Sequence, residues 1–177
     1  MPQSTQRPMR RKDRELSREE TLTVIRHTPH CVIATVDESG TPYATPITAV
    51  LFEGAVYFHS SSDVTGRRYQ NALQNDKVSI VWIGRGETAA DELPKDFSVN
   101  YASAIVEGRI SLVTDEGEKK RVAKAFCLRH VPQAGEEAID KYYAAGGKYV
   151  VFWKVTIDSL SGKARNKQGY FNRILAV

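Results

Sequence analysis

The spacing of hydrophobic and polar positions predicts six β-strands and four helices. Runs that alternate, or that are rich in β-branched and aromatic residues, predict strands over 30–38, 43–53, 55–61, 77–84, 101–113 and 148–160. Helical spacing predicts a helix after Ser17 and helices over 64–76, 115–131 and 135–145. Because the strands mostly follow one another as hairpins, a doubly wound parallel sheet is not expected, and a closed or split antiparallel barrel with helices outside fits better.

Local signals define the ends of the helices. Ser17 and Glu20 form a capping box, and Pro29 ends the helix that they begin. In the second helix, Thr65 is the expected N-cap, and the buried face is expected to include Leu73.

Three features interrupt the regular strand pattern. Pro46 cannot donate a ladder hydrogen bond, so we expect an edge, a bulge or a ligand-facing gap there. Gly108 predicts a bulge or bend in strand 101–113. Residues 85–98 read as a loop long enough to suggest function or disorder.

Length and composition fit one soluble domain. The chain has 177 residues, of which 41% are hydrophobic, and no apolar run reaches the roughly 18 residues of a membrane span. Cys31 and Cys127 match no metal or redox spacing, so we expect two reduced thiols in a cytoplasmic protein. A net charge of +4 is too small to indicate nucleic acid, and His27 and His30 have no third metal ligand nearby.

The stretch from Val56 to Arg68 carries the strongest chemical signal. Its strand places His59 and Ser61 on one face and Ser60 on the other. A helix start follows, where backbone amides are free, and it contains Gly66, Arg67 and Arg68. Hydroxyls, amides and guanidiniums together describe a phosphate monoester site. The alternative is a solvated strand end followed by a basic helix, and no Walker or Rossmann glycine pattern is present.

Four ordered pieces of sequence carry a family resemblance. They are "MRRKDREL", "ATVDESGTPYATPITAVLFEGAVYFHSSSDVTGRR", "YASAIVEGRISLVTDEGEKKRVAKAFCLRHVP" and "LSGKAR", and together they cover roughly residues 9–165. Their order resembles the FMN-binding split-barrel superfamily, which includes the pyridoxamine-phosphate oxidases, and within it the nitroimidazole-resistance (Nim-type) flavoproteins. The resemblance implies a mainly β fold with peripheral α-helices (α+β), a six-stranded antiparallel split β-barrel of Greek-key type.

The resemblance also implies where the cofactor binds. FMN is expected at a homodimer interface, with its ring along "TPIT", its phosphate at the serines and the basic pair, and Lys163 placing positive charge near the ring. The cofactor-binding residues are then Thr45, Pro46, Ile47, Thr48, His59, Ser60, Ser61, Gly66, Arg67, Arg68, Ser103 and Lys163. Ser103 contacts the ring or the ribityl chain, from the same or the other subunit. His59 is the expected catalytic residue beside the flavin; the alternative is a histidine of the barrel wall.

The domain organisation and activity follow from the same resemblance. We expect a flexible basic arm over 1–16, an FMN-binding domain over 17–165, and a C-terminal extension over 166–177 without an assigned role. The implied activity is electron transfer from reduced nicotinamide, NAD(P)H, to a small acceptor such as a nitroimidazole or other nitroaromatic. The alternatives are a pyridoxamine phosphate oxidase-like or deazaflavin-dependent enzyme, or a non-catalytic flavin- or haem-binding protein. No metal, nucleic acid or membrane partner is expected.

Overall fold

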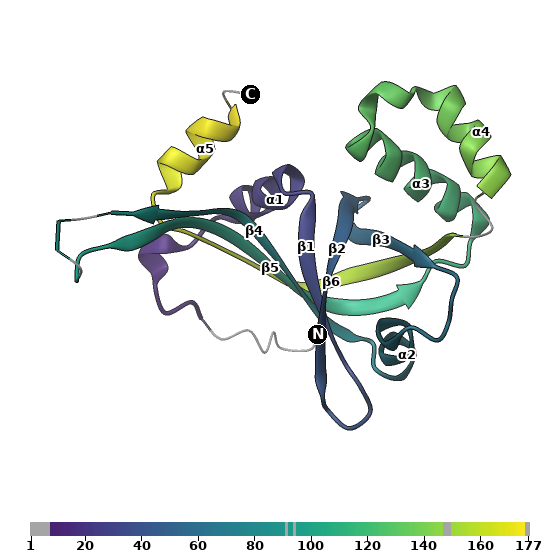
Figure 1. The fold of residues 1–177 in the computed structure, drawn as a ribbon, viewed down its shortest axis with the longest axis horizontal. Coiled ribbons are helices and arrows are strands. Elements are labelled where there is room, and N and C mark those ends of the chain that lie inside the picture. The colour runs from purple at the N-terminus through teal and green to yellow at the C-terminus, as the bar shows by residue number, and fades with distance from the viewer. Residues whose placement is uncertain (1–7, 91, 94, 147–149, 176–177) are drawn as a thin grey trace.

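A six-stranded antiparallel barrel forms the centre of the protein (Figure 1). The computed structural model describes residues 8–90, 92–93, 95–146 and 150–175. The strands are β1 His30–Val36, β2 Pro42–Phe52, β3 Ala55–Ser61, β4 Lys77–Ala89, β5 Ser98–Leu112 and β6 Val150–Ala164. The α-helices are α1 Arg18–His27, α2 Arg67–Gln74, α3 Glu116–His130, α4 Glu136–Gly146 and α5 Lys167–Leu175. Two 3-10 turns, η1 Lys12–Arg14 and η2 Pro132–Ala134, complete the described elements.

The strands pair in the order β1-β2-β3-β6-β5-β4, and β4 returns to β1. Because β3 and β4 are consecutive in sequence but not neighbours in the barrel, the chain crosses between them through α2, which is a Greek-key connection. The predicted α+β class and antiparallel barrel are confirmed. Within the described residues, no helix is long and apolar enough to cross a membrane.

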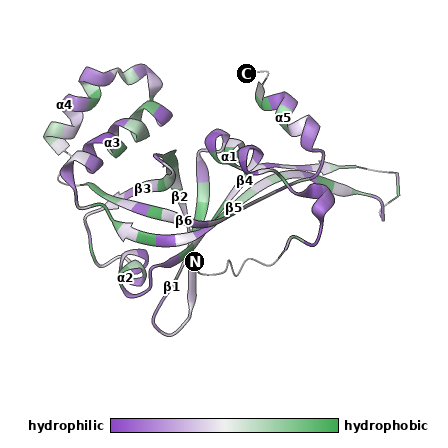
Figure 2. Ribbon diagram, turned by 180° about the vertical axis from the view of Figure 1, so that it is seen from behind, coloured by the Kyte–Doolittle hydropathy of each residue, from purple (hydrophilic) through white to green (hydrophobic). Residues whose placement is uncertain are grey.

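Alternation along the strands separates the barrel interior from an outer layer. Val56 and Phe58 of β3 belong to the main core inside the barrel, whereas Tyr57 packs in a second cluster with Val122 of α3. Bands of hydrophobic and hydrophilic residues alternate along β5 and β6 in Figure 2. The barrel therefore buries one face of each strand in a common core, and α3 and α4 cover part of its outside.

The barrel is split between β2 and β3. The two strands pair only where Ala49–Phe52 lie opposite Ala55–Phe58. Residues 42–48 of β2 pair with β1 alone, and residues 59–61 of β3 pair with β6 alone. Pro46 therefore lies in a strand segment with one open edge, one of the three arrangements that its sequence predicts.

The predicted start of α1 is confirmed, whereas the predicted start of α2 is wrong. The capping box at α1 is present: Ser17 Oγ accepts from the Glu20 amide, and the Ser17 amide donates to the Glu20 carboxylate. The predicted N-cap of α2 is wrong, because Thr65 bonds to Asp63 and Gly66 occupies the cap position. Leu73, predicted to be buried, is 57% exposed because the helix buries its other side through Asn71 and Ala72.

The segment predicted as a long loop is strand at both of its ends. β4 continues through Ala89 and β5 begins at Ser98, so the two strands extend into a long projecting hairpin (Figure 1). The register shifts at Gly108, as predicted for a bulge. A Cβ at Gly108 would lie 2.1 Å from the Thr156 carbonyl oxygen, so only glycine allows this close approach of backbone.

Both ends of the described chain pack on the barrel. Leu16 is buried, and its amide donates to the Gly162 carbonyl at 3.0 Å. Glu15 forms a β-bridge with Lys163 of β6, and Arg14 donates to the Tyr101 hydroxyl of β5, so the end of the predicted arm lies on the barrel. Residues 1–7 of that arm lie outside the described residues. At the other end, Tyr170 of α5 is buried in the main core, and Lys167 pairs with Glu20 at 2.6 Å.

Candidate functional site

The split between β2 and β3 brings together the hydroxyls and arginines that the sequence singled out. Ser60 lies at the open end of β3, where its Oγ accepts from Trp153 Nε1 at 3.0 Å. Ser61 Oγ accepts from the Asp63 amide at 3.1 Å, which forms the turn toward α2. Gly66 caps α2, and a side chain there would meet no neighbouring atom closer than 4.0 Å. The start of α2 therefore presents open backbone next to two serines.

Arg68 points into the split. Its Nη1 donates to Thr45 Oγ1 of β2 at 3.3 Å, and its guanidinium lies 5.2 Å from the ring centroid of Phe58 in β3. Burial lowers the pKa of Arg68, and among the described residues no carboxylate forms an ion pair with it. A half-buried guanidinium without a counter-charge is a ready partner for an anion such as phosphate.

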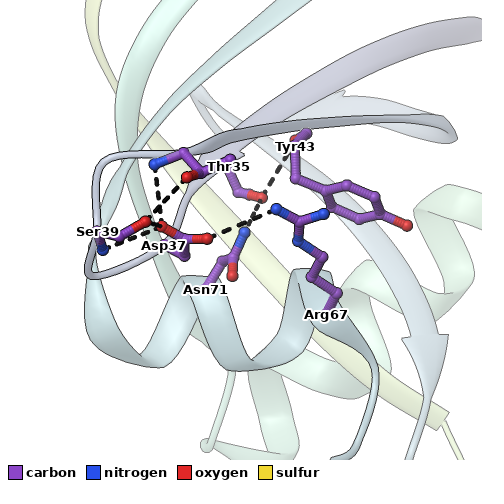
Figure 3. Close-up of polar contacts among 7 residues, drawn as sticks. Thr35, Asp37, Ser39, Tyr43, Arg67 and Asn71 are labelled. Atoms are coloured by element: carbon purple, nitrogen blue, oxygen red, sulfur yellow. Dashed lines mark hydrogen bonds and ion pairs between the residues drawn. The ribbon is translucent and has the colours of Figure 1, made fainter.

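Arg67 points away from the split, toward the β1–β2 hairpin (Figure 3). Its Nη2 lies 3.5 Å from the Asp37 carboxylate, and its guanidinium stacks 4.6 Å from the Tyr43 ring centroid. Asp37 also accepts from Ser39 and from the Thr41 amide, so the turn holds it in place. The two arginines could not be distinguished from the sequence alone. In the structure, Arg67 already has a carboxylate and an aromatic partner, whereas Arg68 has no carboxylate partner among the described residues.

A buried hydrogen bond holds α2 against β1. Asn71 is 3% exposed, and its Nδ2 donates to Thr35 Oγ1 at 3.1 Å (Figure 3). Thr35 Oγ1 in turn donates to the Tyr43 carbonyl at 3.3 Å. These contacts fix the helix that carries Arg68. Sequence reasoning missed them, because a polar pair 36 residues apart gives no local signal.

The remaining residues of the predicted ring site divide into two groups. Ile47 points into the core and is 8% exposed, so only its backbone can reach a ligand, whereas Pro46 and Thr48 are more accessible. Ser103 and Lys163 pair with each other across β5 and β6, and Ser103 Oγ donates to the Lys163 carbonyl at 3.5 Å. β3 pairs with β6 only as far as Val155, and Lys163 lies eight residues farther along β6, about 26 Å at roughly 3.3 Å per residue. One subunit therefore does not bring Ser103 and Lys163 to its own split.

His59 lies beside the split but faces outward. Its ring meets the ring of Phe126 in α3 edge-on, with centroids 4.7 Å apart. Burial, and secondarily the charge of Arg68, lower the pKa of His59 below its ordinary value of 6.5. The imidazole is therefore neutral near pH 7 and can either donate or accept a proton in a hydrogen bond. The strand alternation that separates His59 from Ser60 is the one that the sequence predicts.

The residues at the split fit a phosphate-bearing flavin. They supply an unpaired guanidinium, hydroxyls of two serines, the N-terminus of α2 and an open strand edge for a planar group. The thiols offer no alternative chemistry: burial raises the pKa of Cys31 to about 12, and burial also raises the pKa of Cys127. Both cysteines are free, and both stay protonated as small apolar groups.

The closed antiparallel barrel and its split between β2 and β3 together define a split-barrel fold. The sequence profile of the pyridoxamine 5'-phosphate oxidase family matches residues 17–164. The chain belongs to that family, and the family-level prediction from the ordered motifs is confirmed.

Solved structures share this fold at low sequence identity. A candidate 5-nitroimidazole antibiotic resistance protein of Bacteroides thetaiotaomicron has a TM-score of 0.69 and 19% identity, covering 84% of this chain and 85% of that chain. The flavocytochrome Anf3 of Azotobacter vinelandii has a TM-score of 0.72 and 18% identity, covering 90% and 72%. The FAD and heme binding protein of Mycobacterium smegmatis has a TM-score of 0.69 and 16% identity, covering 85% and 72%. These likenesses show the fold.

One curated relative is similar over part of its length. The tRNA modification GTPase MnmE of Lachnoclostridium phytofermentans is 29% identical over 114 residues, which is 62% of this chain. This chain spans only 24% of that protein. Because the present sequence has no Walker glycine loop, the GTPase activity is not carried over.

Proposed function

We propose that this protein binds FMN at the split between β2 and β3 and is an FMN-dependent oxidoreductase. The observation that carries the proposal is Arg68, a half-buried guanidinium that touches both sides of the split and has no carboxylate partner among the described residues. Flavin binding by three of the structural neighbours, stated for the flavocytochrome, the FAD and heme binding protein and an FAD-binding protein of Mesorhizobium loti, agrees with it.

Each part of the site has a separate role in this proposal. Arg68, the serines and the first amides of α2 hold the phosphate, and Gly66 leaves room for it. The open edge of β2 from Thr45 to Thr48 lies along the ring and supplies backbone hydrogen bonds. When bound, FMN supplies the capacity to accept two electrons from a reduced nicotinamide and to pass them on. The protein's residues bind the flavin, orient its ring and set the charge around it.

The acceptor is proposed to be a small nitroaromatic, such as a nitroimidazole. The balanced net reaction converts a nitro group, a reduced nicotinamide and a proton into a nitroso group, an oxidised nicotinamide and water. His59 faces the outside of the barrel next to this site and is neutral near pH 7, so it can position the acceptor through a hydrogen bond. The shared fold with a candidate 5-nitroimidazole resistance protein supports this choice of acceptor.

A second copy of the chain is proposed to complete the site. Ser103 and Lys163 pair with each other far along β5 and β6 from the segment of β6 that borders the split, on an outer face that also carries exposed Ile83 and Ile105. In a homodimer that buries this face, the partner subunit's Lys163 can place positive charge near the ring, and the partner subunit's Ser103 can reach the ring or ribityl chain. The charge would then tune the flavin from outside the subunit that holds the phosphate.

The two neighbouring arginines provide the experimental test. Arg68→Ala removes the unpaired guanidinium, and a charge-assisted hydrogen bond is worth about 1.5–3 kcal/mol, so the dissociation constant for FMN should rise roughly 10–100-fold. Arg67→Ala is the matched control, since Arg67 is engaged by Asp37 and Tyr43. Titration of FMN into each protein, followed by flavin fluorescence, measures the difference.

The same preparations separate FMN from the other cofactors. Mass spectrometry of the cofactor released from the purified protein should identify FMN rather than FAD, a deazaflavin or haem. Reduced nicotinamide should then bleach the flavin absorbance, and nitroimidazole should restore it. Equal FMN affinity in both arginine variants would falsify the phosphate assignment. Retention of FMN without bleaching would indicate a binding protein instead of an enzyme.

A further inference from the structure

An apolar cavity lies outside the barrel, beneath the two helices that follow β5. It has a volume of about 380 Å³ and is enclosed by α3, η2, α4 and the outer faces of β3 and β6. Its walls are built largely from aromatic and aliphatic side chains, among them Phe126, Phe152, Ile139 and Val150. Tyr142 lines it while remaining 69% exposed, so the cavity opens to solvent on the α4 side. It is separate from the split, which lies between β2 and β3.

Two imidazoles are the main polar groups in this wall. His59 and His130 both contact the ring of Phe126, with centroid distances of 4.7 and 4.6 Å. Burial lowers the pKa of His130, as the charge of Arg129 also does, and burial likewise lowers the pKa of His59. His130 Nε2 is buried and makes no hydrogen bond of normal geometry with a described residue, although the Ala49 backbone lies close enough to the imidazole to oppose the lowering of its pKa. A buried polar atom without a partner costs about 1–3 kcal/mol, which a bound ligand can recover.

We propose that this cavity binds an uncharged aromatic molecule of one or two rings, which accepts or donates a hydrogen bond at His130 Nε2. An apolar cavity of about 150 Å³ holds benzene, so about 380 Å³ accommodates one or two substituted rings. Phe126 and Phe152 offer aromatic faces and edges for ring contacts. Among the described residues, no lysine, arginine or carboxylate lines the cavity, so they offer a charged ligand no counter-charge for its lost hydration.

The location connects this ligand to the proposed flavin site. His59 is adjacent in β3 to Ser60, and the backbone of Ala49, where β2 and β3 begin to pair, lies close enough to His130 to influence its pKa. The cavity wall therefore adjoins the end of the strand segment along which the flavin ring is proposed to lie. A ligand in this cavity could serve as the electron acceptor, and that role rests on the proposed function. The binding of the ligand to the cavity does not depend on the proposed function.

Binding can be tested with two probes of nearly the same shape. 4-Fluoronitrobenzene is uncharged, and 4-fluorobenzoate carries a negative charge on a group of similar size. Fluorine NMR titration of the full-length protein should show saturable binding of the nitro compound at least about tenfold tighter than that of the benzoate. Equal affinity for the two probes, or no binding of the nitro compound, would overturn the proposal.

Two substitutions on one helix locate the binding site. Ala138 lines the cavity and is exposed, so Ala138→Trp should fill it without disturbing the core and should abolish binding of 4-fluoronitrobenzene. Ala144→Trp, on the same helix but not in the cavity wall, should leave the affinity unchanged. Equal effects of the two variants would show that the probe binds elsewhere and would overturn the assignment.

A third substitution tests the hydrogen bond, and a fourth separates this site from the flavin. His130→Leu should weaken binding of 4-fluoronitrobenzene about tenfold while leaving 4-fluorotoluene, which has no acceptor, unchanged. Equal losses for both probes would contradict the role of Nε2. Arg68→Ala should leave the affinities for 4-fluoronitrobenzene and 4-fluorotoluene unchanged even if it weakens FMN binding. The experiment can therefore contradict the FMN site and the aromatic cavity independently. Displacement of the nitro compound by haem, with a Soret shift lost in Ala138→Trp, would overturn the choice of a small aromatic ligand.

Discussion

Two histidines in the wall of the apolar cavity give the protein a predictable dependence on pH. Burial lowers the pKa values of His59 and His130 below the ordinary 6.5, so the unfolded chain binds more protons than the folded chain as pH falls from about 6.5. Their neutral forms contribute stability that is fully present above pH 6.5 and is lost below it. We expect the melting temperature of the wild type to fall more between pH 7.5 and pH 5.5 than that of the His59→Gln, His130→Gln double variant. Parallel melting curves across this range would contradict the lowered pKa values.

At the level of single residues, the directions in which the Arg67 and Arg68 side chains point could not be predicted from the sequence. The basic pair and the serines are visible in the sequence as chemistry, but which arginine enters the split depends on where α2 begins. Thr65 turns toward Asp63, so the N-cap is Gly66, one residue later than predicted, and the helix begins at Arg67. That start leaves Arg67 over Tyr43 and Arg68 over Phe58. A local propensity rule cannot choose between Thr65 and Gly66 as the cap when a neighbouring carboxylate competes for the hydroxyl.

The attachment of α2 to β1 determines how well the arginine is positioned. Asn71→Leu would remove the buried donor and leave Thr35 Oγ1 without this partner. We expect a loss of about 1–3 kcal/mol in the free energy of unfolding, measured by urea denaturation, together with weaker FMN binding. Gln74→Leu is the matched control, because Gln74 is exposed on the same helix and should change stability by less than about 0.5 kcal/mol. Equal stability of both variants would show that the Asn71 contact does not hold the helix.

Elements whose signals are local in the sequence could be predicted. Elements that depend on pairing with residues far away in the sequence could not. The capping box correctly predicted the start of α1, and α3 occupies Glu116–His130 where helical spacing predicted a helix over 115–131. The polar segment 85–98 was predicted as loop because it lacks apolar alternation. It is strand through Ala89 because β4 and β5 pair with each other there, and because Glu87 forms ion pairs with Arg85 and Arg173. Pairing and ion pairs across long sequence separations leave no period in the sequence.

At the scale of the whole molecule, the succession of strands in the sequence predicted the antiparallel barrel. It did not predict that one outer face of the barrel carries a row of exposed apolar side chains. Val32, Val81 and Ile105 lie in one cross-strand row on β1, β4 and β5. Val32 is 39% exposed, Ile105 is 38% exposed, and Ile83 beside them is 67% exposed. Single exposed apolar residues are ordinary, but a contiguous apolar row on a sheet is the kind of surface that the proposed homodimer would bury. Its position beside Ser103 and Lys163 is what connects it with the cofactor site.

A lysine placed in this row should therefore affect both assembly and cofactor binding. In the proposed homodimer, Ile105→Lys would bury an unpaired ammonium, so the dimer dissociation constant should rise at least about 100-fold. Because Ser103 and Lys163 of each copy are proposed to complete the other's site, the resulting monomer should also bind FMN more weakly. Light scattering after size-exclusion chromatography and an FMN titration measure the two effects. Leu128→Lys, which changes an exposed leucine on α3, should alter neither. A wild-type protein that is monomeric while fully loaded with FMN would refute the shared site, because one subunit would then hold the cofactor without the distant serine and lysine.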